Sequence, residues 1–135
     1  MEVDNEKVKA FVKGTLGCGC DDALFEDVEA REGMQDDGFD REYLIGQRLL
    51  VRTVSPTDKQ ALLKTLPMLV ATGFDEREKR ALNRFRLVVF SEQPKEMEAA
   101  VLPLFVRLSQ VDDRVHLHVL PLDEKRPSHK PATAF

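Results

Sequence analysis

The strongest constraint on the fold is the alternation of strand and helix patterns along residues 43–120. Apolar residues recur at every second position in three segments and at helical spacing in two. The strand segments lie at about 43–54, 84–90 and 115–120, and the helical ones at about 57–72 and 93–109. Because alternating β and α segments are typical of parallel strands joined by right-handed crossovers, we expect a βαβαβ unit. Its sheet is predicted to be three-stranded and mainly parallel, with the helices on its one apolar face.

Residues 1–30 predict a helical elbow that precedes the βαβαβ unit. Asp4 can cap a first helix, and the apolar residues that lead up to Leu16 recur at helical spacing. Gly17 suits the left-handed residue that ends a helix. A second helix is predicted from about Asp21, where acidic residues in the first turn are favoured by the helix dipole.

The charge of the chain is segregated along the sequence. Residues 21–42 contain ten acidic and two basic residues, whereas the net charge of the whole chain is −4. Within this stretch, residues 31–42 combine turn formers with like charges and predict an acidic connector. Residues 1–122 are therefore expected to form a single α/β domain. The proline-containing residues 123–135 have little apolar surface to bury and predict a disordered tail.

Length and composition exclude several classes of protein. A chain of 135 residues buries enough surface to fold without a disulfide or a metal ion. No apolar run reaches the roughly 20 residues of a membrane span, and the first six residues are too polar for a signal peptide. We therefore expect a cytoplasmic protein that does not enter a membrane.

One row of side chains in the predicted sheet is basic. Alternation along the strands places the following four arginines opposite the apolar rows: Arg48, Arg52, Arg84 and Arg86. One explanation is that these guanidinium groups pair with the acidic residues 21–42 folded across the sheet. The other is that they form a contact face for a small anionic ligand or a protein partner. Only Phe90 adds an aromatic ring to this row, which disfavours single-stranded nucleic acid.

Cys18 and Cys20 form the most specific motif of the chain, because two thiols separated by one residue can point to a common centre. Together with His116 and His118, which share one side of a predicted strand, they are candidate ligands of a Cys₂His₂ zinc site. A homodimer that pools four thiolates around zinc or an iron–sulfur cluster is an alternative.

Two further interpretations of Cys18 and Cys20 remain open. A disulfide between them closes a very small ring that would be easily reduced, which suits thiol–disulfide chemistry. Both cysteines can also be small apolar side chains packed in a tight elbow.

The run Thr15-Leu16-Gly17-Cys18-Gly19-Cys20 resembles a motif in small uncharacterised prokaryotic proteins with an N-terminal LGCGC sequence. The resemblance covers the N-terminal elbow alone and implies no particular activity. It indicates that the cysteine pair matters.

These patterns favour a small binding or accessory module with a partly basic sheet face over an enzyme. Self-association is also expected, because a small sheet exposes its edges. The alternative is a thiol-based site at Cys18 and Cys20, either a metal centre or a thiol–disulfide oxidoreductase.

Overall fold

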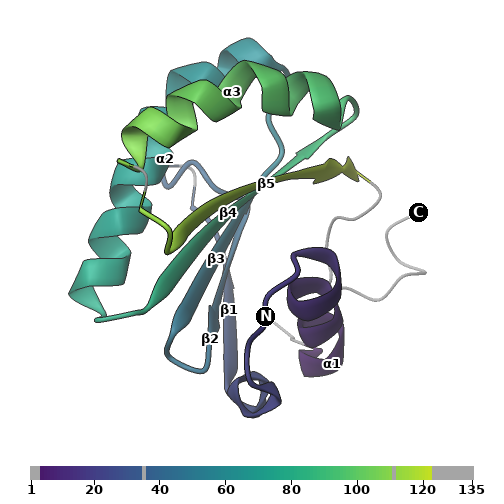
Figure 1. Cartoon of the computed structure of the whole chain (residues 1–135), viewed down its shortest axis with the longest axis vertical. Coiled ribbons are helices and arrows are strands. Elements are labelled where there is room, and N and C mark those ends of the chain that lie inside the picture. The colour runs from purple at the N-terminus through teal and green to yellow at the C-terminus, as the bar shows by residue number, and fades with distance from the viewer. Residues whose placement is uncertain (1–3, 35, 111, 123–135) are drawn as a thin grey trace.

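The computed structural model describes residues 4–34, 36–110 and 112–122 as a mixed α/β fold with a five-stranded sheet (Figure 1). The predicted tail, residues 123–135, lies outside the described residues. The strands are β1 (Val28–Glu32), β2 (Arg41–Ile45), β3 (Leu49–Val54), β4 (Arg84–Ser91) and β5 (Val115–Pro121). The helices are α1 (Asn5–Lys9), the π-helical η1 (Ala10–Thr15), the 3₁₀ turn η2 (Asp22–Glu26), α2 (Lys59–Lys79) and α3 (Pro94–Leu108).

The strands follow one another across the sheet in the order β1-β2-β3-β4-β5. β1, β2 and β3 pair antiparallel, whereas β3, β4 and β5 pair parallel. The helices α2 and α3 provide the two crossovers of the parallel half, as the alternating pattern predicts. The sheet is therefore mixed and larger than the expected three-stranded one.

The segment predicted as one strand, residues 43–54, is a hairpin. β2 ends at Ile45, and the chain reverses through Gly46 and Gln47, whose φ angles are +59° and +55°. Arg48 N–H donates to the Ile45 carbonyl across this turn, at 3.1 Å. Two consecutive positive φ angles define the tight hairpin turn that matches strand twist. Because apolar residues flank the turn on both sides, the sequence pattern predicts one continuous strand over residues 43–54.

The second predicted helix is also corrected by the structure. Only the short turn η2 forms, with Asp21 accepting a hydrogen bond from Ala23 N–H at its start. The chain then enters β1, an edge strand that pairs with β2. The expected acidic connector is thus shorter than residues 31–42, since its two ends belong to β1 and β2. β1 was missed because its alternation is short and its polar residues carry charge.

Two apolar cores lie on opposite faces of the sheet. One core packs α2 and α3 against residues such as Leu50, Phe85 and Leu87. The other packs the elbow, residues 8–25, against residues such as Val51 and Val88. Figure 1 shows α1 on the face opposite α2 and α3. Helices therefore cover both faces, and the expectation of helices on one face is wrong.

The helix α2 approaches the sheet most closely at Gly73. An added Cβ at this position would overlap the ring carbons of Phe85, whose side chain is fully buried in β4. The absence of a side chain at Gly73 therefore sets the distance between α2 and β4.

We expect Gly73→Ala to lower the free energy of unfolding by about 2 kcal/mol, because overpacking against Phe85 outweighs the better helix propensity of alanine. Gly14→Ala is the matched control, since an added Cβ there meets no atom within 4 Å. Urea unfolding monitored by circular dichroism measures both changes. Equal stability of the two variants would contradict the close approach.

Candidate functional site

The four arginines of the predicted basic row do not share a face in the structure. Arg48 lies exposed in the turn that precedes β3. Arg52 alternates with Leu50 and Val54 and faces α2, whereas Arg84 and Arg86 pair in register with Leu49 and Val51 and face the elbow. The sequence could not fix which face of β3 matches which face of β4, because both rows of β3 are largely apolar.

Arg52 is held by partners within the fold. Its Nε donates to Glu42 at 2.8 Å, and both side chains are only 4% exposed. Its Nη1 donates to Thr72 Oγ1 of α2 at 3.2 Å, and its guanidinium lies 4.4 Å from the centre of the Phe39 ring. A second arginine, Arg31, donates to the other oxygen of Glu42 at 2.8 Å. Arg52 therefore pairs with Glu42 of the acidic segment, within the fold.

Arg86 is buried without a carboxylate partner among the described residues. The residue is 7% exposed. Its Nη1 contacts His118 Nε2 at 2.8 Å and the Leu16 carbonyl at 3.4 Å. Its Nε is buried and has no hydrogen-bond partner in the described part of the chain. Since a guanidinium only donates, His118 Nε2 must accept, which makes His118 neutral with its proton on Nδ1.

Two histidines and a second arginine surround Arg86. His116 pairs in register with Arg86, and His118 pairs with Val88, so both imidazoles lie on the elbow face of the sheet. Arg84 and both imidazoles are half-buried. We call these four residues the basic cluster: Arg84, Arg86, His116 and His118.

The histidines of the basic cluster are kept neutral by their surroundings. The pKa of His118 is lowered to about 4, first by burial and then by the charge of Arg86 and by the neighbouring His116. Burial, with Arg86 and then Arg84, also lowers the pKa of His116, and Asp113 partly opposes this. His116 Nε2 is buried and has no hydrogen-bond partner within the described residues. Near neutral pH the positive charge of the cluster therefore comes from its two arginines.

Cys18 and Cys20 form a disulfide in the elbow, with their Cα atoms 5.3 Å apart. Gly17, with a φ angle of +74°, begins the turn that brings them together. Cys18 is 6% exposed and packs in the elbow core, whereas Cys20 is partly buried at its margin. The backbone N–H of Cys18 donates to the Val12 carbonyl at 3.0 Å. The disulfide loop is thus anchored to the helical part of the elbow.

The predicted zinc ligands do not converge in the structure. The sulfurs of Cys18 and Cys20 are bonded to each other, and His118 is engaged by Arg86. Across residues 4–34, 36–110 and 112–122, no group of three or more His, Cys, Asp or Glu side chains is placed to hold a metal ion.

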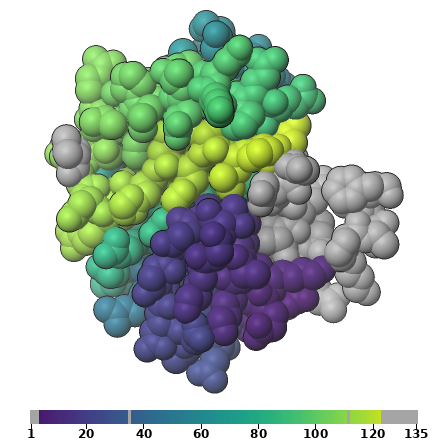
Figure 2. Space-filling view, turned by 45° about the vertical axis from the view of Figure 1, so that its right-hand side comes forward, coloured from purple at the N-terminus to yellow at the C-terminus, as the bar shows by residue number. Residues whose placement is uncertain are grey.

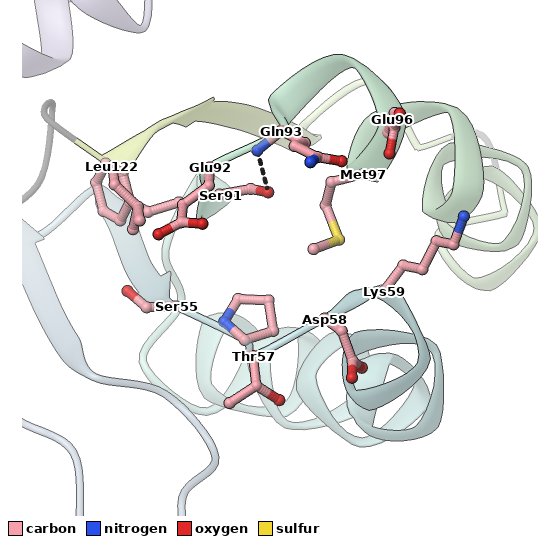
Figure 3. Close-up of a pocket in the computed structure, with 12 residues that line it drawn as sticks. Ser55, Thr57, Asp58, Lys59, Ser91, Glu92, Gln93, Glu96, Met97 and Leu122 are labelled. Carbon is pink, nitrogen blue, oxygen red and sulfur yellow. Dashed lines mark hydrogen bonds between the residues drawn. The ribbon is translucent and has the colours of Figure 1, made fainter.

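A cleft of about 570 Å³ opens where β3 and β4 end and α2 and α3 begin (Figure 3). Its apolar wall contains Pro56, Phe90, Met97 and Leu122. Its polar wall contains Ser55, Thr57, Asp58, Lys59, Ser91, Glu92, Gln93 and Glu96. Ligands of α/β sheets bind outside the carboxyl ends of the strands. This cleft was not predicted from the sequence, although Ser55 and Ser91 directly follow predicted strands.

Comparisons with known proteins add no family to these observations. No protein-family model matches the chain, and neither a curated protein nor a solved structure gives a significant match. No helix in the described part of the chain has the length and apolar character needed to cross a membrane.

We expect the stability of the protein to fall between about pH 6.5 and pH 4 because of His118. The unfolded chain takes up a proton near pH 6.5, whereas folded His118 stays neutral until about pH 4. The contribution is about 1.5 kcal/mol, roughly half of the unscreened value, because the ring is partly exposed. Urea unfolding of the wild type and of His118→Gln from pH 8 to pH 4 measures it. Identical pH profiles would contradict a neutral His118.

We expect Arg52 and Arg86, which are both buried, to respond differently to replacement by methionine in phosphate-free buffer. Arg52→Met leaves the buried Glu42 with only one of its two cations and should cost about 3 kcal/mol. Arg86→Met removes a buried charge that has no described counterion and should leave the protein at least as stable. Thermal and urea unfolding compare the variants. An equal loss in both would show that Arg86 is paired as well as Arg52.

Proposed function

We propose that this protein is a binding module that takes a phosphate- or carboxylate-bearing ligand on the basic cluster. The observation that carries this proposal is the buried guanidinium of Arg86, which has no described carboxylate partner and leaves Nε unpaired. A buried charge costs several kcal/mol unless it is paired and hydrogen-bonded. An oxyanion supplies both the missing charge and the missing acceptor.

Two nitrogens of the cluster support binding of one oxyanion. Arg86 and His116 are register partners on neighbouring strands, and each has a buried nitrogen without a partner in the described residues. A guanidinium nitrogen and a protonated imidazole nitrogen both donate to an oxyanion. Arg84, two residues before Arg86 on the same face, adds a second positive charge that is half-buried.

The site lies where the elbow meets the sheet. Figure 2 shows the atoms of the N-terminal elbow, in purple, packed against β5, in yellow. The Leu16 carbonyl accepts from Arg86 Nη1 and so fixes one side of the guanidinium. The remaining donors of the cluster belong to β4 and β5, where Arg84 and both histidines are half-buried.

A second candidate function is thiol–disulfide exchange at Cys18 and Cys20. It is supported by the disulfide itself and by the greater exposure of Cys20, which is the sulfur that an external thiolate reaches. A dithiol reductant would transfer two electrons and two protons to the pair and become a disulfide. Alkylation of the two thiols before and after incubation with reduced dithiothreitol tests this function. A disulfide that resists reduction in the folded protein would exclude it.

The anion site is tested by titrating ¹⁵N-labelled protein with inorganic phosphate and with citrate at constant ionic strength. We expect saturable shifts in the amides of Arg86, His116 and His118, with tighter binding at pH 6 than at pH 7.5. The pH dependence follows because a bound anion favours the protonated form of His116. In the free protein this form is opposed first by burial and then by Arg86 and Arg84, and it is favoured by Asp113.

Two arginine variants provide the matched comparison. Arg86→Met should weaken phosphate and citrate binding at least tenfold, whereas Arg48→Met, which removes an exposed arginine outside the cluster, should leave it unchanged. Binding that is lost equally in both variants indicates a general effect of net charge. That result, or the absence of saturable shifts with either anion, would overturn the proposed function.

A further inference from the structure

The two edges of the sheet differ in how they are protected from pairing with another strand. β1 and β5 are the edge strands, and such strands carry backbone groups that have no neighbour. Charged side chains are a common protection, and three of the five residues of β1 are charged: Glu29, Arg31 and Glu32. β5 contains no Lys, Arg, Asp or Glu over its seven residues. It is therefore a long edge without this protection.

The register of β5 shows which of its backbone groups are free. Phe85 N–H of β4 donates to the Arg114 carbonyl at 3.0 Å, and the two strands pair in parallel. Alternation along this ladder then directs toward β4 the N–H and C=O groups of His116, His118 and Leu120. Leu117 and Val119 direct theirs to the other side, where β5 has no neighbour among the described strands. Two donors and two acceptors are thus free in the middle of the edge.

Both ends of this free edge lack a free donor. Val115 N–H donates to the Asp112 carbonyl at 3.1 Å, and Pro121 has no N–H. Antiparallel pairing of two β5 strands about His118 overlaps all seven residues. It sets Val115 opposite Pro121 of the second copy, so that the two ends without free donors meet. β5 is therefore complementary to itself in this register.

The side chains of β5 also tolerate this pairing. Leu117 and Val119 pack against the core under α2 and α3, are partly buried, and would lie opposite one another across the axis. On the elbow face, His118 would lie opposite its own copy. Because His118 accepts a hydrogen bond from Arg86, it is neutral, and no like charges meet at the axis.

The helix beside this edge is also suited to a second copy. α3 contacts both β4 and β5, and Figure 2 shows β5, in yellow, at the surface between α3, in green, and the elbow. In a continued sheet the two α3 helices lie two strand spacings apart, about 10 Å, which is a normal distance for packed helices. α3 exposes two large apolar side chains one turn apart, Leu102 and Val106, each 41% exposed.

We propose that a second copy of this chain pairs with β5, antiparallel and about a two-fold axis at His118, so that the two sheets become one. Leu117 and Val119 exchange backbone hydrogen bonds with Val119 and Leu117 of the second copy, and the two α3 helices become neighbours. The inference does not rest on anion binding, because the groups that join the copies are the free backbone groups of β5.

Analytical ultracentrifugation of the full chain tests the association. The interface is small, so we expect a Kd of about 10 μM and a mostly dimeric protein at a chain concentration of about 100 μM. A chain that is still monomeric at this concentration would overturn the proposal.

A proline on each edge of the sheet provides the matched comparison. Val119→Pro removes a free N–H without removing a hydrogen bond to β4, and should weaken dimerisation at least tenfold. Ala30→Pro is the control on β1. Gly33 N–H donates to the Asp40 carbonyl of the neighbouring chain segment at 2.9 Å, so alternation directs Ala30 N–H away from β2. Circular dichroism checks that both variants fold. A dimer that survives Val119→Pro, or one that Ala30→Pro dissociates equally, would reject pairing at β5.

Amide hydrogen exchange of the wild type tests the same edge without a substitution. Exchange at Leu117 and Val119 should slow at least tenfold as the chain concentration rises through the Kd, whereas exchange at Ala30 should stay the same. Protection of Leu117 and Val119 that does not depend on concentration would mean that β5 pairs within its own chain. Protection that rises at Ala30 instead would place the contact on β1. Either result would overturn the proposal.

Discussion

The burial of β3 and β4 on both faces is the constraint on which the rest of the structure depends. Leu50 and Val51 are neighbours on β3 that face opposite cores, and both are fully buried, as are Phe85 and Val88 on β4. Strands in this position leave no solvent-facing row for a charge. Each polar side chain on them must therefore find its partner inside the protein or in a ligand.

The protein meets this constraint in two ways. Arg52 lies on the α2 face and receives a complete set of partners from Glu42, Thr72 and Phe39, so its charge serves the fold. Arg86 lies on the elbow face and has a neutral imidazole and one carbonyl instead. The contrast between two buried arginines on adjacent strands is what separates a structural ion pair from a candidate site.

The regular parts of the fold were predictable from sequence, and the reasons for the failures are local. α3, β4 and β5 follow clear periodic patterns and lie close to their expected ranges. The hairpin was not predicted because its turn, Gly46 and Gln47, is short and has apolar residues on both sides. The prediction of a shared basic face was wrong because β3 is apolar on both sides, so alternation alone could not show which face of β3 matches which face of β4. The unpaired state of Arg86 depends on contacts between distant elements, which no sequence pattern contains.

The contact between Leu16 and Arg86 has a consequence for the order in which the chain assembles. The two residues are 70 positions apart, so the elbow leaves the ribosome before β4 and must wait until β4 has been made. Until then the apolar stripe of the elbow has only part of its docking surface, supplied by β2 and β3. The elbow is therefore made before β4 and completes its packing only after it, and the disulfide loop reaches its final surroundings at the same step.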